Sequence, residues 1–245
     1  MLSAVAVTKN FAGVHALRGV TFQLREGTVI GLIGPNGSGK TTLLNCVSGV
    51  FAPSGGMISL DARPIGGRPA YELARRGIVR TFQNVRLFDG LTVVQNVQIG
   101  AVAAGKVKRR DSLSYARAAL GRLGLGDLED RYAGTLSYGD QRRLEIARAL
   151  AASPRFLLLD EPAAGMNEAE SEELGASIGR IRSERGCGVL VVDHDLRLIM
   201  RLCEHIYVLN EGVLISEGKP DAVRRDRAVL AAYVGEEDER GKESG

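Results

Sequence analysis

A glycine-rich stretch that ends in lysine and threonine is the clearest chemical pattern in the sequence. GPNGSGKT, residues 34–41, matches G-x-x-x-x-G-K-[S/T] and lies between an apolar run and a helix-forming run, which is the context of a phosphate-binding loop. Its glycines let successive backbone N–H groups face phosphate oxygens. Lys40 adds a charge for the β- and γ-phosphates, and the Thr41 hydroxyl can coordinate Mg²⁺. A flexible glycine turn would not explain lysine and threonine at this spacing. The residues predicted to bind the nucleotide here are Gly34, Pro35, Asn36, Gly37, Ser38, Gly39, Lys40, Thr41 and Thr42.

An acidic pair follows another apolar run in FLLLDEP, residues 156–162. Asp160 is expected at the carboxyl end of a buried strand, the edge where ligands of open α/β sheets bind. A carboxylate there can hold the shell of Mg²⁺ through water. Glu161 can act as the general base for the attacking water, a role worth ~10²–10⁴ in rate. A solvated acidic turn is the alternative, and the phosphate-binding loop favours the catalytic interpretation.

A histidine and a glutamine also follow predicted strands. His194 ends GVLVVDH at the same edge of the sheet. A γ-phosphate would lie there, which favours a phosphate-sensing role over the structural role that a lone histidine usually has. His15 and His205 are interpreted as structural. Gln83, in RTFQN, is on residue type alone a surface glutamine between a strand and a helical segment.

The stretch LSYGDQ, residues 136–141, has two interpretations. Ser137 and Asp140 have the form of a capping box ahead of the helix-forming run QRRLEIARALAA. A serine and a glycine, here Gly139, at a helix start also make an anion site, because free backbone N–H groups and the helix dipole point outward. Since residues 34–41 already provide a phosphate site, the anion that this stretch would bind is an open question.

Strands that alternate with helices must position these residues. Predicted strands cover residues 2–8, 19–24, 28–34, 155–160 and 188–193, a hairpin turns at 210–212, and predicted helices cover 94–105, 114–125, 141–152, 168–186, 195–204 and 221–234. This alternation predicts an α/β fold with a largely parallel sheet covered on both faces. We expect a single domain over residues 1–245 with a core of about 1–83 and 154–218, an inserted helical subdomain of about 84–153, and a C-terminal helix and disordered tail of about 219–245.

The composition is typical of a globular protein of a reducing compartment. A chain of 245 residues, 44% hydrophobic and 25% charged, can bury a full core, and a net charge of +3 predicts no bulk electrostatic partner. The basic run KVKRR, residues 106–110, is interpreted as a solvated face, with lipid-headgroup or nucleic-acid contact as the alternative. Cys46, Cys187 and Cys203 predict buried thiols and not disulfides. The sequence shows neither a signal-peptide pattern nor an apolar run near the ~18 residues of a membrane span.

Taken together, the motifs resemble those of ABC-type ATPases. Their order is P-loop 34–41, Q-loop Gln83, signature 136–141, Asp160-Glu161 and switch His194, and the resemblance covers residues from about 5 to 220. The stretches TFQNVRLFDGLTVVQNV, LSYGDQRRLEIARAL, LDEPAAGMN and IYVLNEG are similar to the ATP-binding subunits of branched-chain amino-acid importers, and more to the longer of the two. The resemblance implies a P-loop NTPase fold of ABC type: a mostly parallel sheet core, an antiparallel β edge and an inserted helical subdomain.

The resemblance also implies roles for single residues. Phe11 matches the aromatic residue that stacks on adenine, with Val14 beside it. Gln83 matches the residue that reaches Mg²⁺ and the attacking water and links the core to the helical insertion. The implied catalytic residues are Glu161, His194 and Gln83, and the implied Mg²⁺ ligands are Thr41, Gln83 and Asp160. The implied contacts to a membrane permease, at the groove for its coupling helix, are Val85, Leu87 and Phe88.

The chain departs from the common family pattern in three places. Gly165-Met166-Asn167 stands where the loop ordinarily ends in Leu-Asp, and Asn167 keeps a hydrogen-bonding side chain without the charge. Asp140 replaces a small residue in the signature, and Glu168 stands where proline is common. None of these departures removes a catalytic group.

In this family the signature helix faces the γ-phosphate held by a second, head-to-tail subunit, which answers the question about LSYGDQ. Ser137 and Gly139 are therefore expected to bind the neighbour's ATP, whether that neighbour is a copy of this chain or a different ATPase. The resemblance implies hydrolysis of ATP with Mg²⁺ that powers uptake of branched-chain or related amino acids through permease subunits, at the cytoplasmic side of the membrane. An extracytoplasmic solute-binding protein is an indirect partner, and nucleic acid is not expected.

Three alternatives stay open at this stage. The importer could carry another small solute, such as amides. A soluble ABC ATPase acting on DNA or ribosomes would need coiled-coil insertions or paired cassettes, neither of which the sequence shows. A P-loop small-molecule kinase is disfavoured by LSYGDQ and His194.

Overall fold

Three apolar runs of the sequence form the centre of a six-stranded sheet in the computed structural model, which describes residues 1–105 and 107–233. β3 (Val29–Ile33), β7 (Phe156–Asp160) and β8 (Gly188–Val192) are buried at every position, as the sequence predicted. Strands covered on both faces need apolar side chains throughout, so these runs do not alternate. The sheet order is β10-β9-β3-β8-β7-β6, with β10 antiparallel to β9 and the other neighbours parallel. The outer strands are β6 (Ile78–Arg80), β9 (His205–Asn210) and β10 (Val213–Gly218).

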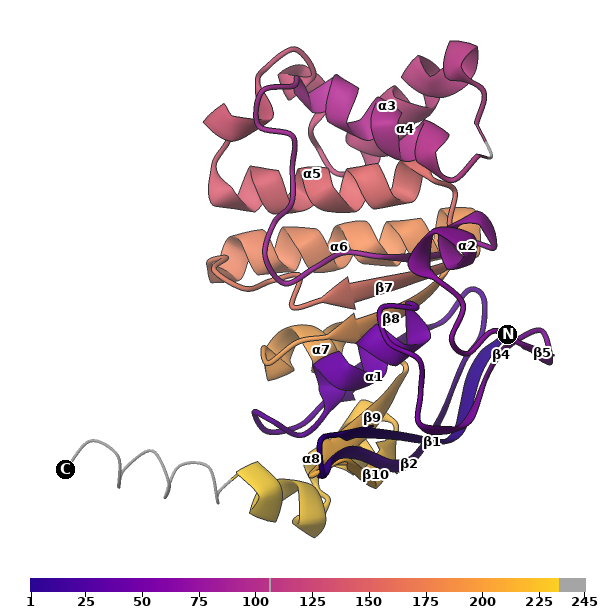
Figure 1. The fold of residues 1–245 in the computed structure, drawn as a ribbon. Coiled ribbons are helices and arrows are strands. Elements are labelled where there is room, and N and C mark those ends of the chain that lie inside the picture. The colour runs from indigo at the N-terminus through magenta and orange to yellow at the C-terminus, as the bar shows by residue number, and fades with distance from the viewer. Residues whose placement is uncertain (106, 234–245) are drawn as a thin grey trace.

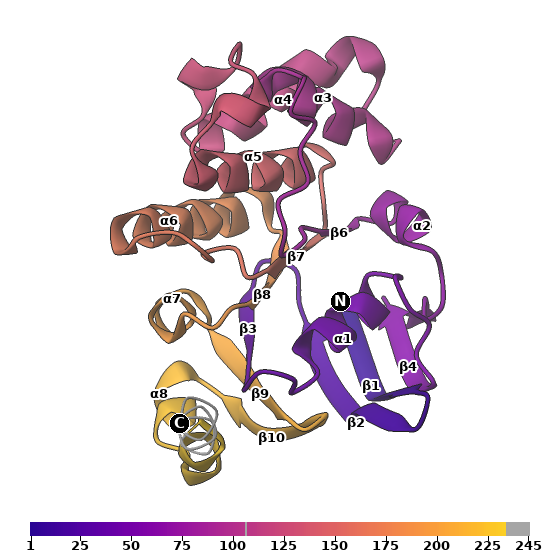
Figure 2. The same ribbon diagram turned by 60° about the vertical axis from the view of Figure 1, so that its left-hand side comes forward.

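The central strands feed two hydrophobic clusters, one on each face of the sheet. One face packs against α6 (Glu168–Arg185) and α7 (Leu196–Leu202), and the other against α1 (Lys40–Val47) and a second sheet (Figure 2). The residues of β3, β7 and β8 on the α6 side are Val29, Ile33, Leu157, Leu159, Val189 and Val191, and those on the α1 side are Ile30, Leu32, Phe156, Leu158, Leu190 and Val192. The predicted covering of both faces is confirmed.

The second sheet is antiparallel, with the order β2-β1-β4-β5. β1 (Leu2–Phe11) and β2 (Val14–Leu24) extend two predicted strands and form a hairpin. Apart from a strand expected before Gln83, no element was predicted from the sequence between residues 51 and 83. This segment forms β4 (Gly55–Leu60), β5 (Arg63–Pro64), α2 (Ala70–Arg75) and β6. Each of these elements is short, and β4 is buried only in its second half, so a periodic apolar pattern does not develop.

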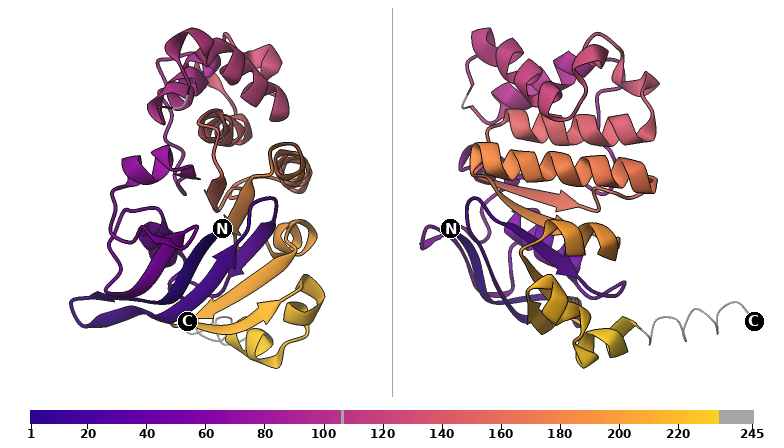
Figure 3. Two further views of the ribbon diagram at one scale, coloured as in Figure 1. Left: turned by 90° about the vertical axis from the view of Figure 1, so that its right-hand side faces the viewer. Right: turned by 180° about the vertical axis from the view of Figure 1, so that it is seen from behind.

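The predicted helical insertion contains three helices that pack on one another at the top of Figure 1. They are α3 (Val93–Ala103), α4 (Ser112–Arg122) and α5 (Tyr138–Ala151). Figure 3 shows α5 between α3 and α4 on one side and α6 on the other. A capping box starts α3: Thr92 Oγ1 accepts from the Gln95 backbone and Gln95 Oε1 accepts from the Thr92 backbone. None of the helices within the described residues is long and apolar enough to cross a membrane.

The predicted single closing helix over residues 221–234 is wrong. Instead, α8 (Pro220–Arg224) ends at Arg224, and a second helical segment begins at residue 227. Asp226 makes the break, because its Oδ1 caps the new segment by accepting from the Ala228 N–H at 2.8 Å and its Oδ2 accepts from the Ser216 hydroxyl at 2.5 Å. The tail predicted to be disordered lies outside the described residues.

Two features singled out from composition have different outcomes. Cys46, Cys187 and Cys203 are buried thiols, as predicted. In the basic run, residues 108–110 are exposed between α3 and α4, while Lys106 lies outside the described residues. The solvated-face interpretation of that run stays a prediction.

Candidate active site

The phosphate-binding loop connects β3 to α1 and depends on two glycines that no other residue could replace. Gly34 has φ +148°, and a Cβ there would lie 1.9 Å from the carbonyl oxygen of Leu209. Gly39 has φ +105°, and a Cβ there would lie 2.6 Å from the carbonyl oxygen of Ala16. Both backbone conformation and close approach therefore require glycine, so the loop is held by its neighbours and is not a flexible turn.

The loop encloses a pocket of about 280 Å³ together with residues from the far side of the sheet edge. Lys40 lies across the loop, where its Nζ donates to the carbonyl oxygens of Gly34 and Pro35, each at 2.7 Å. The pocket is lined by Ala16, Asn36, Gly37, Ser38, Gly39, Lys40, Thr41, Thr42, Gln83 and Glu161. Most of the predicted phosphate-binding residues thus share one cavity with two of the predicted catalytic residues.

Gln83, Glu161 and His194 converge although they are far apart in the sequence. Gln83 Nε2 donates to Glu161 Oε2 at 2.9 Å, and His194 Nδ1 lies 3.9 Å from the same oxygen. Glu161 directly follows β7 and has φ +47°, and its N–H donates to the carbonyl oxygen of Val192 at 2.7 Å. This left-handed conformation is costly for a non-glycine residue and turns the side chain away from that of Asp160.

Asp193 joins the two loops at this edge and was not identified from the sequence. It is 1% exposed. Its Oδ2 accepts from the Ala163 N–H at 3.0 Å and its Oδ1 from the Asp195 N–H at 2.9 Å. Burial raises the pKa of this carboxyl, while the backbone donors act in the opposite direction. The residue thereby holds the segment after Glu161 against the segment that carries His194.

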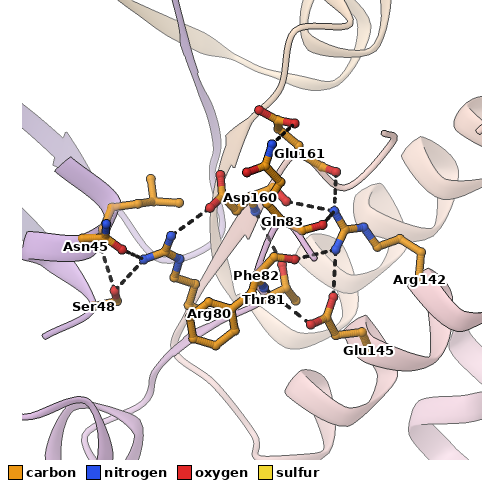
Figure 4. Close-up of polar contacts among 11 residues, drawn as sticks. Asn45, Ser48, Arg80, Thr81, Phe82, Gln83, Arg142, Glu145, Asp160 and Glu161 are labelled. Carbon is orange, nitrogen blue, oxygen red and sulfur yellow. Dashed lines mark hydrogen bonds and ion pairs between the residues drawn. The ribbon is translucent and has the colours of Figure 1, made fainter. Parts of the chain in front are cut away.

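Arg142, in α5, organises the backbone around the catalytic residues (Figure 4). Its side chain is fully buried and pairs with Glu145, with Nη1 2.8 Å from Oε2. Its guanidinium also donates to four backbone carbonyl oxygens, those of Phe82 (2.5 Å), Gln83 (3.0 Å), Asp160 (3.1 Å) and Glu161 (2.6 Å). One side chain therefore ties the Q-loop to the end of β7. From the sequence, Arg142 was expected only as part of a helix-forming run.

A second buried arginine reaches the carboxylate of Asp160. Arg80, the last residue of β6, places Nη2 2.8 Å from Asp160 Oδ2, and the two side chains are 5% and 3% exposed. This residue also escaped the sequence analysis, because arginine is rarely expected inside a protein.

The signature LSYGDQ begins α5 and lies outside the pocket of its own phosphate-binding loop. Ser137 is the N-cap, and its Oγ accepts from the Asp140 N–H at 3.2 Å. The predicted capping box is only half formed, because the Asp140 carboxylate accepts from the Ser137 hydroxyl and from Arg143. Gly165 has φ +75°, and a Cβ there would lie 2.9 Å from the Tyr138 ring. The unusual glycine of residues 165–167 thus makes room for a signature side chain.

The two residues predicted at the adenine lie at the β1–β2 hairpin. Phe11 is 38% exposed and Val14 66% exposed, and Phe11 contacts Phe51 edge-on with ring centroids 5.4 Å apart. Among the described residues, neither is part of the lining of the 280 Å³ pocket. Their contact with a base stays a prediction.

A phosphate-binding loop that shares its pocket with a glutamine and a glutamate from the adjacent sheet edge defines the class of P-loop nucleotide-binding proteins. Known proteins narrow this class. The ABC transporter family matches residues 17–164, and the family described as branched-chain amino acid ATP-binding cassette transporter matches residues 213–239. The high-affinity branched-chain amino acid transport ATP-binding protein BraF of Pseudomonas aeruginosa is 42% identical over 250 residues, which cover 96% of this chain and 98% of BraF.

Solved structures agree with this assignment. MJ1267, an ATP-binding cassette of an ABC transporter in its ADP conformation, has a TM-score of 0.87 at 31% identity, with 96% of this chain and 98% of that chain covered. The dimeric structure of MJ0796, a bacterial ABC transporter cassette, has a TM-score of 0.80 at 28% identity, with 90% and 99% covered. The chain belongs to the ABC transporter family of ATP-binding cassettes.

Proposed function

We propose that the chain is the ATP-hydrolysing subunit of an importer for branched-chain amino acids. The observation that carries the proposal is the pocket of about 280 Å³ in which the phosphate-binding loop meets Gln83 and Glu161. The similarity to BraF, whose name describes branched-chain amino acid transport, supports the solute class.

In this proposal Glu161 is the general base for the attacking water. Gln83, which donates to Glu161 Oε2, orients that water, and His194, 3.9 Å from the same oxygen, contacts the γ-phosphate. Lys40 leaves the loop carbonyls and places its charge at the β- and γ-phosphates, where negative charge develops in the transition state.

The donors at the site fit Mg²⁺, which prefers oxygen ligands. Two of them line the pocket: the Thr41 hydroxyl at the start of α1 and the Gln83 side-chain oxygen. The third is the carboxylate of Asp160, which ends β7 outside that lining. When bound with ATP, Mg²⁺ neutralises charge on the β- and γ-phosphates. The chain's own part is to hold these oxygens at a fixed spacing.

A second ATPase subunit completes each site in this proposal. The start of α5, a helix of 14 residues, carries Ser137 and Gly139, and neither residue lines the chain's own nucleotide pocket. The outward N–H groups and dipole of a helix start attract phosphate. The solved cassette MJ0796 is dimeric, which supports a pair of ATPase subunits. In the proposal this pair is head-to-tail, so that Ser137 and Gly139 meet the neighbour's ATP.

An apolar groove of about 360 Å³ provides the proposed docking site for a coupling helix of the permease. Three of its large side chains are exposed: Tyr71 (62%), Phe88 (49%) and Ile99 (39%). The groove is lined by Tyr71, Ala74, Val79, Arg80, Phe88, Ile99, Gly100, Ala103, Ala104, Glu145, Arg148, Ala149 and Ala152. Of the three contacts predicted from the resemblance, Phe88 lines this groove. Leu87 packs against the hydrophobic core, and Val85 is half-buried outside the lining.

Reconstitution with the permease tests the function. The tagged chain should bring permease proteins out of detergent-solubilised membranes. Vesicles that contain the complex and ATP should take up labelled leucine, isoleucine and valine, and the same vesicles with Glu161→Gln should not. An active ATPase that associates with no permease would instead indicate a soluble ABC ATPase, and uptake of other solutes alone would refute the solute class.

A further inference from the structure

Arg80 connects three parts of the active site through one buried guanidinium. Nη2 donates to Asp160 Oδ2 at 2.8 Å, and Nη1 donates to Asn45 Oδ1 at 2.6 Å and to Ser48 Oγ at 3.0 Å (Figure 4). Asp160 ends β7, and Ser48 is the C-cap of α1 and directly follows its last residue. Arg80 itself ends β6, three residues before Gln83.

Stability alone is a poor explanation for this ion pair. Burying two charges costs so much desolvation that well-packed apolar residues often serve a fold as well or better. Arg80 Nε also makes no hydrogen bond to any described residue, which adds to the cost. The stacking of the guanidinium over the Phe82 ring, 5.2 Å from its centroid, offsets only part of it. A geometric role for the pair accounts better for its position.

The partners of Arg80 are on the two elements that carry proposed Mg²⁺ ligands. Helix α1 bears Thr41, and Asn45 lies one turn further along the same helix. β7 bears Asp160, whose Oδ2 is held by Arg80, so that Oδ1 is the oxygen left for the Mg²⁺ shell. Mg²⁺ demands near-ideal octahedral geometry, and its affinity therefore depends on the spacing of Thr41 and Asp160.

We propose that Arg80 is a positioning residue for the Mg²⁺ site. It fixes the rotation of the Asp160 carboxylate and the distance from that carboxylate to α1. The inference rests on the proposed binding of ATP with Mg²⁺. Because Arg80 also lines the apolar groove, the Mg²⁺ carboxylate lies one ion pair away from the proposed permease site.

Loss of the Arg80 charge should change Mg²⁺ affinity in opposite directions if Arg80 positions Asp160 and if it acts only through its charge. A positive charge 2.8 Å from the carboxylate repels Mg²⁺, so without a positioning role the loss of that charge would strengthen Mg²⁺ binding. If Arg80 positions Asp160, its loss lets the carboxylate rotate and weakens Mg²⁺ binding.

The experiment measures binding of a non-hydrolysable ATP analogue to the purified chain, first in EDTA and then in a Mg²⁺ titration. Arg80→Gln should keep the affinity in EDTA within about twofold, while the Mg²⁺ concentration for half-maximal effect should rise about tenfold, equal to about 1.4 kcal/mol. Arg80→Lys keeps the positive charge but not the forked guanidinium, and its Mg²⁺ concentration for half-maximal effect should rise less. Arg155→Gln, at the opposite end of β7 and ion-paired with Glu26 and Asp61, is the matched control and should titrate as wild type does.

Two results would overturn the proposal. In Arg80→Gln, the Mg²⁺ concentration for half-maximal effect could be unchanged, or it could be lower than in wild type. If Arg80→Gln does not fold, the double variant Asn45→Ala with Ser48→Ala removes the hydrogen bonds from Arg80 to α1 and keeps its ion pair with Asp160. Its Mg²⁺ concentration for half-maximal effect should rise about threefold. A double variant that titrates as wild type does would contradict the link. If the affinity of the wild-type chain for the ATP analogue did not depend on Mg²⁺, the proposed function would be refuted instead.

Discussion

Removal of Arg142 should destabilise the fold far more than removal of its neighbour in the sequence. Arg142→Met leaves Glu145, 2% exposed, as a buried carboxylate without its partner, at a cost of roughly 3–5 kcal/mol. The four carbonyl oxygens lose their donor as well. For a chain of this length, 1 kcal/mol corresponds to about 2–4 °C in melting temperature, so the carboxylate alone predicts a fall of about 6–20 °C.

Thermal unfolding followed by circular dichroism measures this fall. Arg143→Met is the matched control, because Arg143 is 20% exposed and its pairs with Asp140 and Glu173 are worth at most about 1 kcal/mol each. Arg142→Met combined with Glu145→Met removes both charges and should recover part of the loss, because no orphaned carboxylate remains. A single variant that melts within about 2 °C of wild type would refute the reasoning, and so would a double variant less stable than the single.

Three further outcomes are expected. Glu161→Gln should bind the nucleotide but lose most of its hydrolysis, because the amide cannot accept a proton from water; near-normal turnover in an ATPase assay would show that Glu161 is not the base. Phe88→Ala should leave the ATPase activity of the isolated subunit intact and reduce permease-coupled uptake, and a collapse of basal activity with permease binding preserved would argue against the groove as docking site. The pKa of Asp61 lies below its ordinary value because Arg155 and the N-terminal ammonium donate hydrogen bonds to it, so its stabilisation is present above the unfolded pKa of about 3.9 and is lost as the pH falls below it. Asp61→Asn should therefore flatten the acid side of the stability curve in urea unfolding, and an unchanged acid limb would contradict this.

The sequence predicted the parts of the fold that local pattern determines. The three central strands are continuous apolar runs, and the loop from Gly34 to Thr41 has fixed spacing, so both were found without tertiary information. The break at Asp226 was missed because the helix-forming run continues through it. The break depends on the Asp226 carboxylate, which accepts from the Ala228 N–H and from the Ser216 hydroxyl. The helix propensity of the run is overridden there by the contacts of Asp226, one of which is with a side chain ten residues away.

The polar interior of the site could not be predicted in the same way. Arginine is a residue type usually found on the surface. Arg80 is separated from Asp160 by 80 positions in the sequence, and Arg142 from Asp160 and Glu161 by 18 and 19 positions. Arg142 and Glu145, three residues apart on one helix, have the spacing of a helical ion pair, but this spacing does not reveal that the pair is buried. Contacts of this kind follow from the packing of α5 against the strand edge and cannot be predicted from any single segment of the sequence.

The central claim, that LSYGDQ serves a nucleotide held by the neighbouring subunit, has a direct test in a mixture of two inactive variants. Lys40→Ala disables the phosphate-binding loop of its own chain, and Ser137→Arg blocks the signature with bulk and charge. In a dimer of this chain, each variant alone damages both composite sites and should be nearly inactive. A mixed dimer has one site with both lesions and one intact site, which takes its loop from the Ser137→Arg chain and its signature from the Lys40→Ala chain.

The measurement is ATP trapped at the dimer interface, together with hydrolysis, as the two variants are mixed. The account predicts that mixed dimers trap nucleotide at one site of the interface and that some hydrolysis returns on mixing. Trapped nucleotide without turnover still supports the shared site, because hydrolysis can require both sites at once. Mixed dimers that form but trap no interfacial nucleotide would contradict the account and leave Ser137 as a helix cap alone.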